Sequence, residues 1–423
     1  MIKQKTASAT VIAIIVVAAM AVIATGLFLY PYSPNQPPQA EDTSSTPQGV
    51  QTVVNANNQF AFDLYSELNK NEQSNIFYSP YSISAALAMT YEGAKGKTAD
   101  EMKSVFHFPE NDILRPNFAK IYNDINKKDK AYQLSTGNAL WAQQDYPFLQ
   151  NYLTTVEKYY GGKAANLDFV GETEKSRQTI NSFIEGQTNN KIKDLLPQGS
   201  IDSSIRLVLT NAVYFKGTWE WEFDKGDTSE QDFKITPDNV VQVPMMHMKN
   251  DKARFNYADL EDLQILELPY KGNDISMLIL LPKENLESIE PSLTSEKLSE
   301  WKNQMKEEKL TAVYMPKFEF DTKYSMKETL ETMGMPTAFD SSSADFSGMT
   351  GQKDLFIDFV FHQAYVKVDE QGTEAAAATA VGMTLSAMPQ QNIFRADHPF
   401  IFVIQDKNTE NILFLGRVTD PTK

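Results

Sequence analysis

The sequence predicts an α+β protein with antiparallel or mixed sheets. Apolar residues recur at helical spacing in the first half of the chain, β-rich runs dominate the second half, and the two do not alternate regularly. A doubly wound parallel sheet would require that alternation. The chain has 423 residues, of which 42% are hydrophobic, so it can bury one large core or two smaller ones.

The first element is an apolar segment, residues 11–30, which carries no charged side chain and follows Lys3 and Lys5. A helix of this length spans roughly 30 Å, the thickness of a bilayer core. We predict a membrane anchor or a cleaved signal over residues 1–30, with a buried core helix as the third alternative. The two lysines favour a cytoplasmic N-terminus, so the rest would be extracytoplasmic, either anchored by residues 11–30 or secreted.

Residues 31–50 are rich in proline, serine and glutamine and show no apolar periodicity, which predicts a linker. The folded domain is expected over residues 51–423. It opens with an amphipathic helix, because apolar residues recur at three- and four-residue steps from Val53 to Leu68. Further helices are expected after Ser82 and over residues 150–160 and 175–187. The expected strands are residues 205–215, 263–268, 275–281, 312–320, 356–369, 400–404 and 412–418.

Several function classes lack support in the composition. The formal net charge is −16 and no basic patch offsets it, which argues against nucleic-acid binding. There is no cysteine, so disulfides and thiol nucleophiles are excluded. The four histidines show no metal-ligand spacing, and the common catalytic and phosphate-binding motifs are missing. We expect no enzyme activity, no metal and no cofactor.

One stretch departs from ordinary helix or loop composition. Residues 370–385 read EQGTEAAAATAVGMTL. Alternate positions starting at Thr373 form one face of a strand, and the side chains before Val381 are small apart from Glu374. Such a strand could pass between two others without steric conflict. The pattern also fits an alanine-rich helix or a flexible loop.

Five segments resemble the serpin family, in serpin order. They are residues 75–84 (NIFYSPYSIS), 211–219 (NAVYFKGTW), 360–366 (VFHQAYV), 369–381 (DEQGTEAAAATAV) and 394–402 (FRADHPFIF). The resemblance implies a serpin fold with three β-sheets, eight or nine helices and an exposed reactive-centre loop at about residues 370–394. It also implies inhibition of a serine protease through a covalent complex, in which the cleaved loop inserts into the main sheet.

The resemblance assigns roles to individual residues. The loop hinge would be Glu370, Gly372, Thr373, Glu374, Ala375, Ala376, Ala377 and Ala378, with Gly372 as its pivot. Trp219 and Lys317 would meet Glu370 where the loop joins the sheet, unless Lys317 and Glu370 form only an ordinary exposed pair. A polar cluster beneath the opening strands would hold Ser79, Ser82, Asn211 and His362, either as a network that breaks on opening or as a static one.

Family spacing from Glu370 puts the bait bond between Ser386 and Ala387, which suits elastase-like or subtilisin-like proteases. A slip of one residue gives Leu385 and Ser386, which suits chymotrypsin-like proteases. No arginine or lysine lies between positions 371 and 394, which argues against a trypsin-like target. We expect a monomer without a heparin-type activator. The alternatives are a non-inhibitory serpin that acts as a binding or carrier module, and an enzyme with an unrecognised site.

Overall fold

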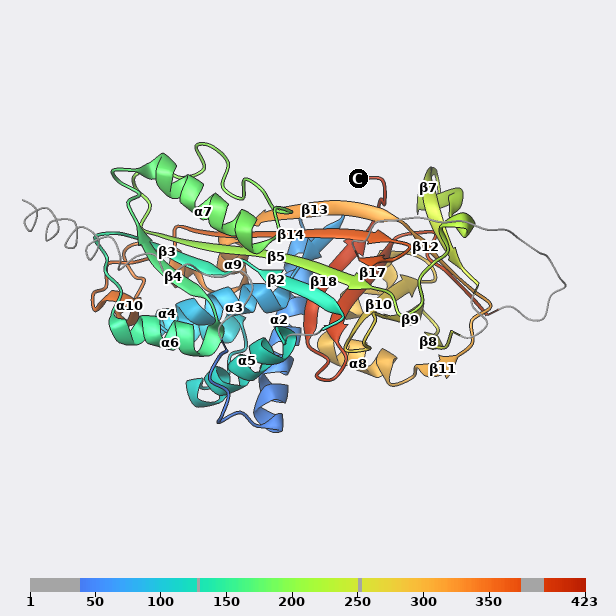
Figure 1. Cartoon of the computed structure of the whole chain (residues 1–423), viewed down its shortest axis with the longest axis horizontal. Coiled ribbons are helices and arrows are strands. Elements are labelled where there is room, and N and C mark those ends of the chain that lie inside the picture. The colour runs from blue at the N-terminus through green and yellow to red at the C-terminus, as the bar shows by residue number, and fades with distance from the viewer. Residues whose placement is uncertain (1–38, 128–129, 250–252, 374–391) are drawn as a thin grey trace, which may run out of the picture. The chain divides into compact units, whose positions relative to one another are not determined.

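Three β-sheets and the helices that cover them make up the folded domain (Figure 1). The computed structural model describes residues 39–127, 130–249, 253–373 and 392–423. Within these residues there are nine α-helices. The predicted α+β class, three sheets and eight or nine helices are confirmed.

The large mixed sheet has the strand order β13-β14-β15-β5-β3-β4, with β2 paired to β5. Its two central long strands, β5 and β14, run parallel, and nearly all of their side chains are buried. Burial on both faces explains why apolar residues occupy consecutive positions in both strands and do not simply alternate with polar ones. The strands are β2 (Tyr132–Thr136), β3 (Ala139–Gln143), β4 (Lys163–Leu167), β5 (Leu207–Thr218), β13 (Phe318–Ser325), β14 (Phe359–Asp369) and β15 (Gly372–Thr373).

The second sheet is antiparallel, with the order β1-β18-β17-β10-β9-β8-β11. Its strands are β1 (Ile76–Tyr78), β8 (Phe255–Asp259), β9 (Leu263–Pro269), β10 (Ile275–Pro282), β11 (Lys306–Glu308), β17 (Phe400–Asp406) and β18 (Ile412–Val418). The third sheet has the order β16-β12-β7-β6. Its strands are β6 (Ser229–Thr236), β7 (Asn239–Met248), β12 (Ala312–Pro316) and β16 (Ile393–Arg395).

The helices begin with α2, whose first turn is capped by the Thr46 hydroxyl accepting from the Gly49 N–H at 3.0 Å. Helix α2 starts within the range predicted as linker, while the domain boundary itself stays a prediction. The α-helices are α2 (Pro47–Asn69), α3 (Pro80–Tyr91), α4 (Gly96–Val105), α5 (Asn111–Ile125), α6 (Gln150–Tyr160), α7 (Thr173–Gln187), α8 (Ser295–Lys302), α9 (Lys327–Met333) and α10 (Ser347–Thr350). Short 3-10 turns are η1 (Lys225–Asp227), η2 (Leu286–Ser288), η3 (Glu290–Ser292) and η4 (Pro336–Phe339).

The single strand predicted over residues 312–320 is wrong in one respect, because it is two strands in two sheets. β12 ends at Pro316 in the third sheet, and β13 begins at Phe318 in the large sheet. Proline has no backbone N–H to continue a ladder, and Lys317 donates its own N–H to the Pro244 carbonyl at 2.9 Å. The crossing places Lys317 at the junction of the two sheets.

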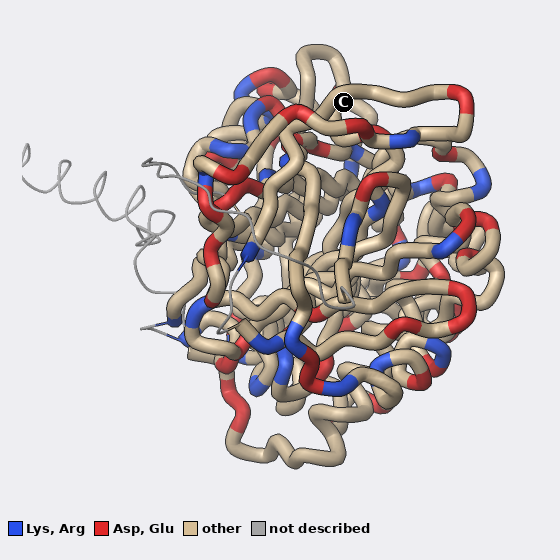
Figure 2. The backbone as a smooth tube through the Cα atoms, turned by 90° about the vertical axis from the view of Figure 1, so that its right-hand side faces the viewer, with Lys and Arg blue, Asp and Glu red and all other residues tan. Residues whose placement is uncertain are grey.

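The segment predicted as an anchor, residues 11–30, lies outside the described residues. Among the helices that the structure describes, none is long and apolar enough to cross a membrane. Figure 2 shows acidic and basic residues interspersed along the described chain.

A buried ion network fixes the last strand. Arg417 of β18, 4% exposed, pairs with Glu290 at 3.2 Å and donates to the carbonyls of Glu72 and Ser74 at 2.7 and 2.8 Å. Glu290 also accepts from the Tyr65 hydroxyl at 2.7 Å. These contacts join α2, η3 and the C-terminal strand.

We expect Arg417→Met to lower the free energy of unfolding by about 3 kcal/mol, because it leaves the Glu290 carboxylate buried without its partner. Urea unfolding measures the loss. The double variant with Glu290→Gln, which removes the orphaned charge, should recover part of it. A single variant as stable as the wild type would contradict this assignment.

Candidate functional site

The candidate site is the seam between β5 and β14 at the centre of the large sheet. Their parallel register runs from Phe359 opposite Val208 to Tyr365 opposite Tyr214. Beyond Tyr365 the two strands separate, and β15 lies between them. Gly372 pairs with Thr218 and Asp369, and Thr373 pairs with Gly217 and Val368. Because β15 is antiparallel to both neighbours, the chain itself starts an additional strand in this seam.

Thr373 is buried where it enters the seam, with 1% of its surface exposed. Its hydroxyl lies 2.7 Å from the hydroxyl of Tyr270, so the two polar groups satisfy each other. The preceding residue has no room for a side chain: a Cβ on Gly372 would lie 1.9 Å from the Gly217 carbonyl oxygen, and its φ is +154°. Glycine is therefore required there for the close approach of two backbones.

The root of the loop is held by an ion pair. The carboxylate of Glu370, 3% exposed, lies 3.1 Å from Lys317 Nζ and accepts from the Thr228 hydroxyl at 2.9 Å. Burial opposes ionisation of the Glu370 carboxyl, but hydrogen bonds from its own backbone N–H, Thr228 and Lys317 outweigh burial and hold its pKa below the usual range. The Glu370 carboxylate is thus buried while the Lys317 side chain is 36% exposed, so the pair is half-buried and not an ordinary exposed one.

Trp219 completes this root. Its backbone N–H donates to the Gln371 carbonyl at 2.8 Å, and its indole N–H donates to the Asp369 carbonyl at 3.0 Å. The indole stacks on Tyr270 with ring centroids 4.4 Å apart. The structure therefore brings Trp219, Lys317 and Glu370 to one place, as the resemblance implied. Their role in loop insertion stays a prediction.

The predicted polar cluster lies beneath the seam. Asn211 of β5 and His362 of β14 are paired in the strand register, and the Asn211 Oδ1 accepts from His362 Nδ1. Asn211 Nδ2 donates to the carbonyl and hydroxyl oxygens of Ser82 at 2.6 Å each. Ser79 donates its backbone N–H to His362 Nε2 at 3.2 Å. Opening the seam between β5 and β14 must therefore break the contact between Asn211 and His362.

His362 is neutral in this cluster. It is fully buried, and burial lowers its pKa to about 3. Since Nε2 accepts from Ser79, the proton of the neutral ring lies on Nδ1 and is donated to Asn211. The imidazole thus bridges α3 and the two central strands without a charge.

Helix α7 covers the seam on one face of the sheet (Figure 1). Ile180 and Ile184 of α7 belong to an apolar cluster with Val208 and Ala212 of β5 and Phe361 of β14. A strand that inserts along the whole seam must therefore also part this cluster.

Part of the predicted site lies outside the described residues. This holds for the hinge residues Glu374, Ala375, Ala376, Ala377 and Ala378, and for the bait-bond residues Leu385, Ser386 and Ala387. Three residues of the site were missed: Thr228 and Tyr270 at the root and Asn138 in the polar cluster, where its Oδ1 accepts from Ser82 at 2.9 Å. No local pattern marks them.

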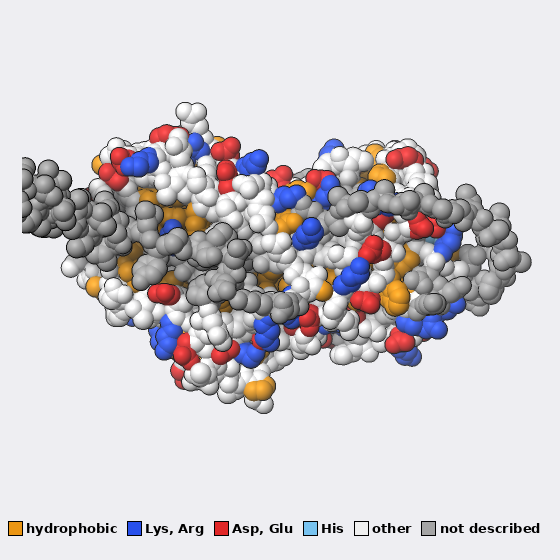
Figure 3. Space-filling view, viewed as in Figure 1, with side chains coloured by type: hydrophobic (Ala, Val, Ile, Leu, Met, Phe, Trp, Pro, Cys, Tyr) orange, Lys and Arg blue, Asp and Glu red, His pale blue; other side chains and the backbone are white. Residues whose placement is uncertain are grey.

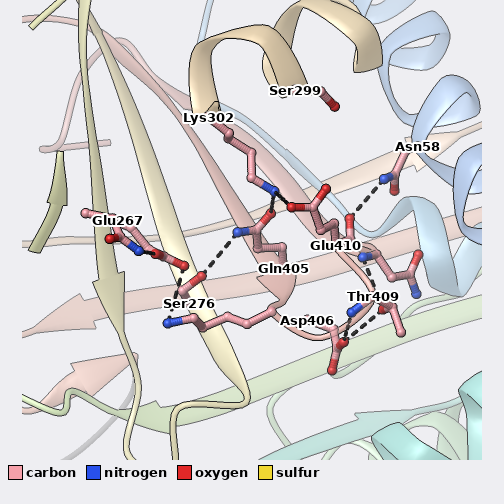
Figure 4. Close-up of polar contacts among 12 residues, drawn as sticks. Asn58, Glu267, Ser276, Ser299, Lys302, Gln405, Asp406, Thr409 and Glu410 are labelled. Carbon is pink, nitrogen blue, oxygen red and sulfur yellow. Dashed lines mark hydrogen bonds and ion pairs between the residues drawn. The ribbon is translucent and has the colours of Figure 1, made fainter. Parts of the chain in front are cut away.

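A hollow of about 390 Å³ lies elsewhere, between α2, α8 and the turn from β17 to β18. Lys302 of α8 contacts Gln405 at 3.0 Å and Glu410 at 2.8 Å there (Figure 4). On the face drawn in Figure 3, acidic and basic side chains of the described residues are interspersed.

His398 lies three residues after β16, the strand that follows the loop. Its Nδ1 lies 2.9 Å from Asp397 Oδ1, and its Nε2 lies 2.7 Å from the Pro282 carbonyl oxygen. Burial opposes protonation, but the hydrogen bonds to Asp397 and Pro282 outweigh it and raise the pKa of His398 above its usual value.

Because this pKa is higher in the folded state, the stabilisation is fully present below the unfolded pKa and is lost as pH rises through the folded value. We expect the difference in free energy of unfolding between the wild type and His398→Gln to shrink from pH 6 to pH 9. The trend should be weaker in an Asp397→Asn background, which lacks the negative charge of the carboxylate but keeps the Pro282 carbonyl as a partner. A difference that grows with pH would overturn this assignment.

These features define a class: a protein whose own loop begins an additional strand in the central seam of a mixed sheet, above a buried polar network. The serpin (serine protease inhibitor) family profile matches residues 55–421, and the chain belongs to this family. Family membership makes it a relative of protease inhibitors and not of enzymes.

Individual relatives are similar in sequence to this chain over nearly the whole domain. The chain is 41% identical to human serpin B3, covering 88% of this chain and 100% of that protein. It is 40% identical to rat leukocyte elastase inhibitor A, again covering 88% and 100%. A structure of human thyroxine-binding globulin with its hormone is similar at a TM-score of 0.79 and 31% identity, covering 89% and 100%.

Proposed function

We propose that this chain is a suicide-substrate inhibitor of extracytoplasmic serine proteases. One observation carries the proposal: β15 already lies between β5 and β14, antiparallel to both, in the uncut chain. Residues 374 onwards would need only to continue this strand along the seam. The name of the rat relative, leukocyte elastase inhibitor A, supports the same function.

The trapping step follows ordinary acyl-transfer chemistry. The protease serine Oγ attacks the carbonyl carbon of Ser386 while the protease histidine takes the hydroxyl proton. The bond to Ala387 then breaks, the proton passes to the leaving amine, and Ser386 stays on the protease as an ester. Inhibition requires that the freed arm inserts before water hydrolyses this ester.

Insertion would move the tethered protease far from its starting point. Residues 373–385 as a strand span roughly 43 Å at about 3.3 Å per residue. The inward side chains up to Thr379 are small, and neither proline nor an inward charge blocks the arm. The polar cluster of Asn211 and His362 would break and re-form around the new strand.

Exposure to elastase, subtilisin and chymotrypsin, followed by mass spectrometry and denaturing electrophoresis, tests the proposal. We expect a denaturant-stable adduct and a cut after Ser386. A cut after Leu385 would move the bait bond by one residue and favour chymotrypsin-like targets. If every protease only nicks the loop and none is retained, the inhibitory function is wrong for these targets.

A second candidate is a non-inhibitory carrier. The hollow of about 390 Å³ between α2 and α8, and the similarity to thyroxine-binding globulin, support it. Its polar groups Lys302, Gln405 and Glu410 are already paired with one another, which leaves fewer groups free for a ligand. Loop cleavage without any gain in heat resistance would favour the carrier.

We also propose that residues 11–30 tether the domain outside the cytoplasmic membrane, with residues 31–50 as a spacer. Cell fractionation of the full chain and of a chain lacking residues 1–30 tests this. Recovery of the full chain in the cytosol would overturn it.

A further inference from the structure

A hollow of about 480 Å³ lies on the second sheet, apart from the seam of the large sheet. The end of the second sheet formed by β9, β8 and β11 makes its floor, and the segment that follows β5 makes one wall. A volume of this size is within the range of sites that bind small molecules in proteins. The proposed inhibitory function does not use this hollow.

The strand register places polar side chains in one row across the floor. Asn256 of β8 stands opposite Glu307 of β11, and its Nδ2 donates to Glu267 of β9 at 2.6 Å. Glu267 is 7% exposed, and its carboxylate also lies 3.6 Å from Lys407 Nζ. Lys407 in turn donates to Asn273 Oδ1 at 2.6 Å. The inner groups of the hollow are therefore paired with one another.

Three charged groups at the rim have no oppositely charged partner among the described residues. The guanidinium of Arg254, an exposed residue, donates only to the Ala253 carbonyl, at 3.3 Å. Glu220 and Glu307 are also exposed, and neither carboxylate has an ion pair or a hydrogen bond within the described part of the chain. One cation and two carboxylates thus line the same hollow without neutralising one another.

An aromatic side chain belongs to the wall beside these charges. Trp221 is half-buried and lines the hollow together with Pro269. Its backbone is held on both sides, because Glu220 donates its N–H to the Pro269 carbonyl at 2.9 Å and Phe223 donates its N–H to the Glu370 carbonyl at 2.8 Å. Among aromatic side chains, tryptophan attracts a cation most strongly. The wall therefore adds to the two carboxylates a third group that favours a positively charged ligand atom.

We propose that this hollow binds a small zwitterion, a molecule in which a carboxylate and an ammonium group lie close together. Arg254 binds the carboxylate, because a guanidinium can donate two parallel N–H bonds to it. Glu220, Glu307 and Trp221 surround the ammonium group. The ligand class therefore comprises free amino acids and betaines. The site is independent of protease inhibition, since it belongs to the uncut chain and needs no target protease.

Charge balance separates this class from other ligands. A phosphate group would be repelled by the two rim carboxylates, with a single guanidinium to offset them. The described residues hold no group of three or more histidine, aspartate or glutamate side chains that could bind a metal ion, so a divalent cation lacks ligands here. A ligand with only one charge would leave either the guanidinium or the carboxylates without a partner.

Calorimetric titration of the full chain at low ionic strength measures binding. Glycine and glycine betaine are the zwitterionic probes, while acetate and tetramethylammonium carry the two charges on separate molecules. We expect a dissociation constant of roughly 0.1–1 mM for at least one zwitterion, since so small a ligand makes few contacts. Each single-charge probe should bind at least about tenfold more weakly. The zwitterion that binds more tightly supports the site and shows whether its ammonium group is primary or quaternary.

Two results of this titration would overturn the proposal. One is binding of acetate or tetramethylammonium as tight as that of the better zwitterion, because the site would then read a single charge. The other is no binding of either zwitterion up to about 10 mM, well above the expected dissociation constant.

Variants show whether a bound zwitterion occupies this hollow. Arg254→Met keeps the aliphatic stem but removes the guanidinium, so it should weaken binding by about tenfold or more. Trp221→Leu should weaken it by roughly threefold. Arg206→Met is the matched control, because the Arg206 guanidinium also donates only to backbone carbonyls near it in the chain and does not line the hollow.

The control variant should bind like the wild type. Circular dichroism and the melting temperature of each variant show whether it is folded, which separates a lost contact from a lost fold. If folded Arg254→Met binds the zwitterion as tightly as Arg206→Met does, the ligand does not use this hollow and the proposal is wrong.

Discussion

Cutting the chain within residues 374–391 should raise its melting temperature by about 15 °C or more. In the uncut chain β5 and β14 share one parallel ladder over the seam. A strand inserted between them replaces that ladder by two antiparallel ones, so the net gain is one ladder of roughly a dozen hydrogen bonds at about 1 kcal/mol each. Burial of Val381 and Met383 adds about 1.5–3 kcal/mol each.

A gain of about 12 kcal/mol or more corresponds to a shift of about 15 °C or more, because the unfolding entropy of a domain of this size gives roughly 1.3 °C per kcal/mol. Differential scanning calorimetry of the intact and cut chains measures it. A chain cut instead at an engineered protease site in the exposed turn between Thr236 and Asn239 serves as control, because that cut does not free the loop. If the loop-cut chain melts no higher than the intact one, the seam stores no energy for trapping.

The helices and strands with strong periodicity could be predicted from the sequence. α2, α6 and α7 match their predicted ranges apart from their ends. The spacing of apolar residues along the sequence shows which face of a helix is buried, and this spacing is a local property of the chain. The break between β12 and β13 was not predictable. Residues 312–320 are continuously β-rich, and only the identity of the neighbouring strands shows that the chain changes sheets at Lys317.

The site was predictable only as far as the family resemblance extended. The resemblance predicted that Lys317 and Glu370 lie close together, although 53 residues separate them in the sequence. Thr228 and Tyr270 were missed because their contacts with Glu370 and Thr373 span 142 and 103 residues and depend on sheet register. Periodicity encodes which face of a strand is buried, but it does not encode which strand lies beside it.

The second large effect is expected at Thr373, the residue that enters the seam first. Its side chain is 1% exposed, lies between Gly217 and Val368 in the strand register, and is bonded to the Tyr270 hydroxyl at 2.7 Å. Thr373→Arg would place a charge in this position without a partner, at a cost of several kcal/mol. We expect the proportion of protease retained as a covalent complex to fall at least tenfold, while cleavage of the loop continues.

Two further variants separate the effect of a buried charge at position 373 from a general loss of stability. Gln133→Arg puts the same side chain on an exposed position of β2 in the same sheet and should trap like the wild type. Thr373→Val keeps the size of the residue but leaves the Tyr270 hydroxyl unpaired, at about 1–3 kcal/mol. Because this hydrogen bond is already formed in the uncut chain, the cost falls on the starting and the inserted state alike, and trapping should stay within about threefold of the wild type. Denaturing electrophoresis of timed mixtures with the target protease gives all three results. If Thr373→Arg still forms the complex in wild-type yield, the strand that starts at β15 is not the path by which the loop inserts, since a buried arginine at its first position could not leave that path unaffected.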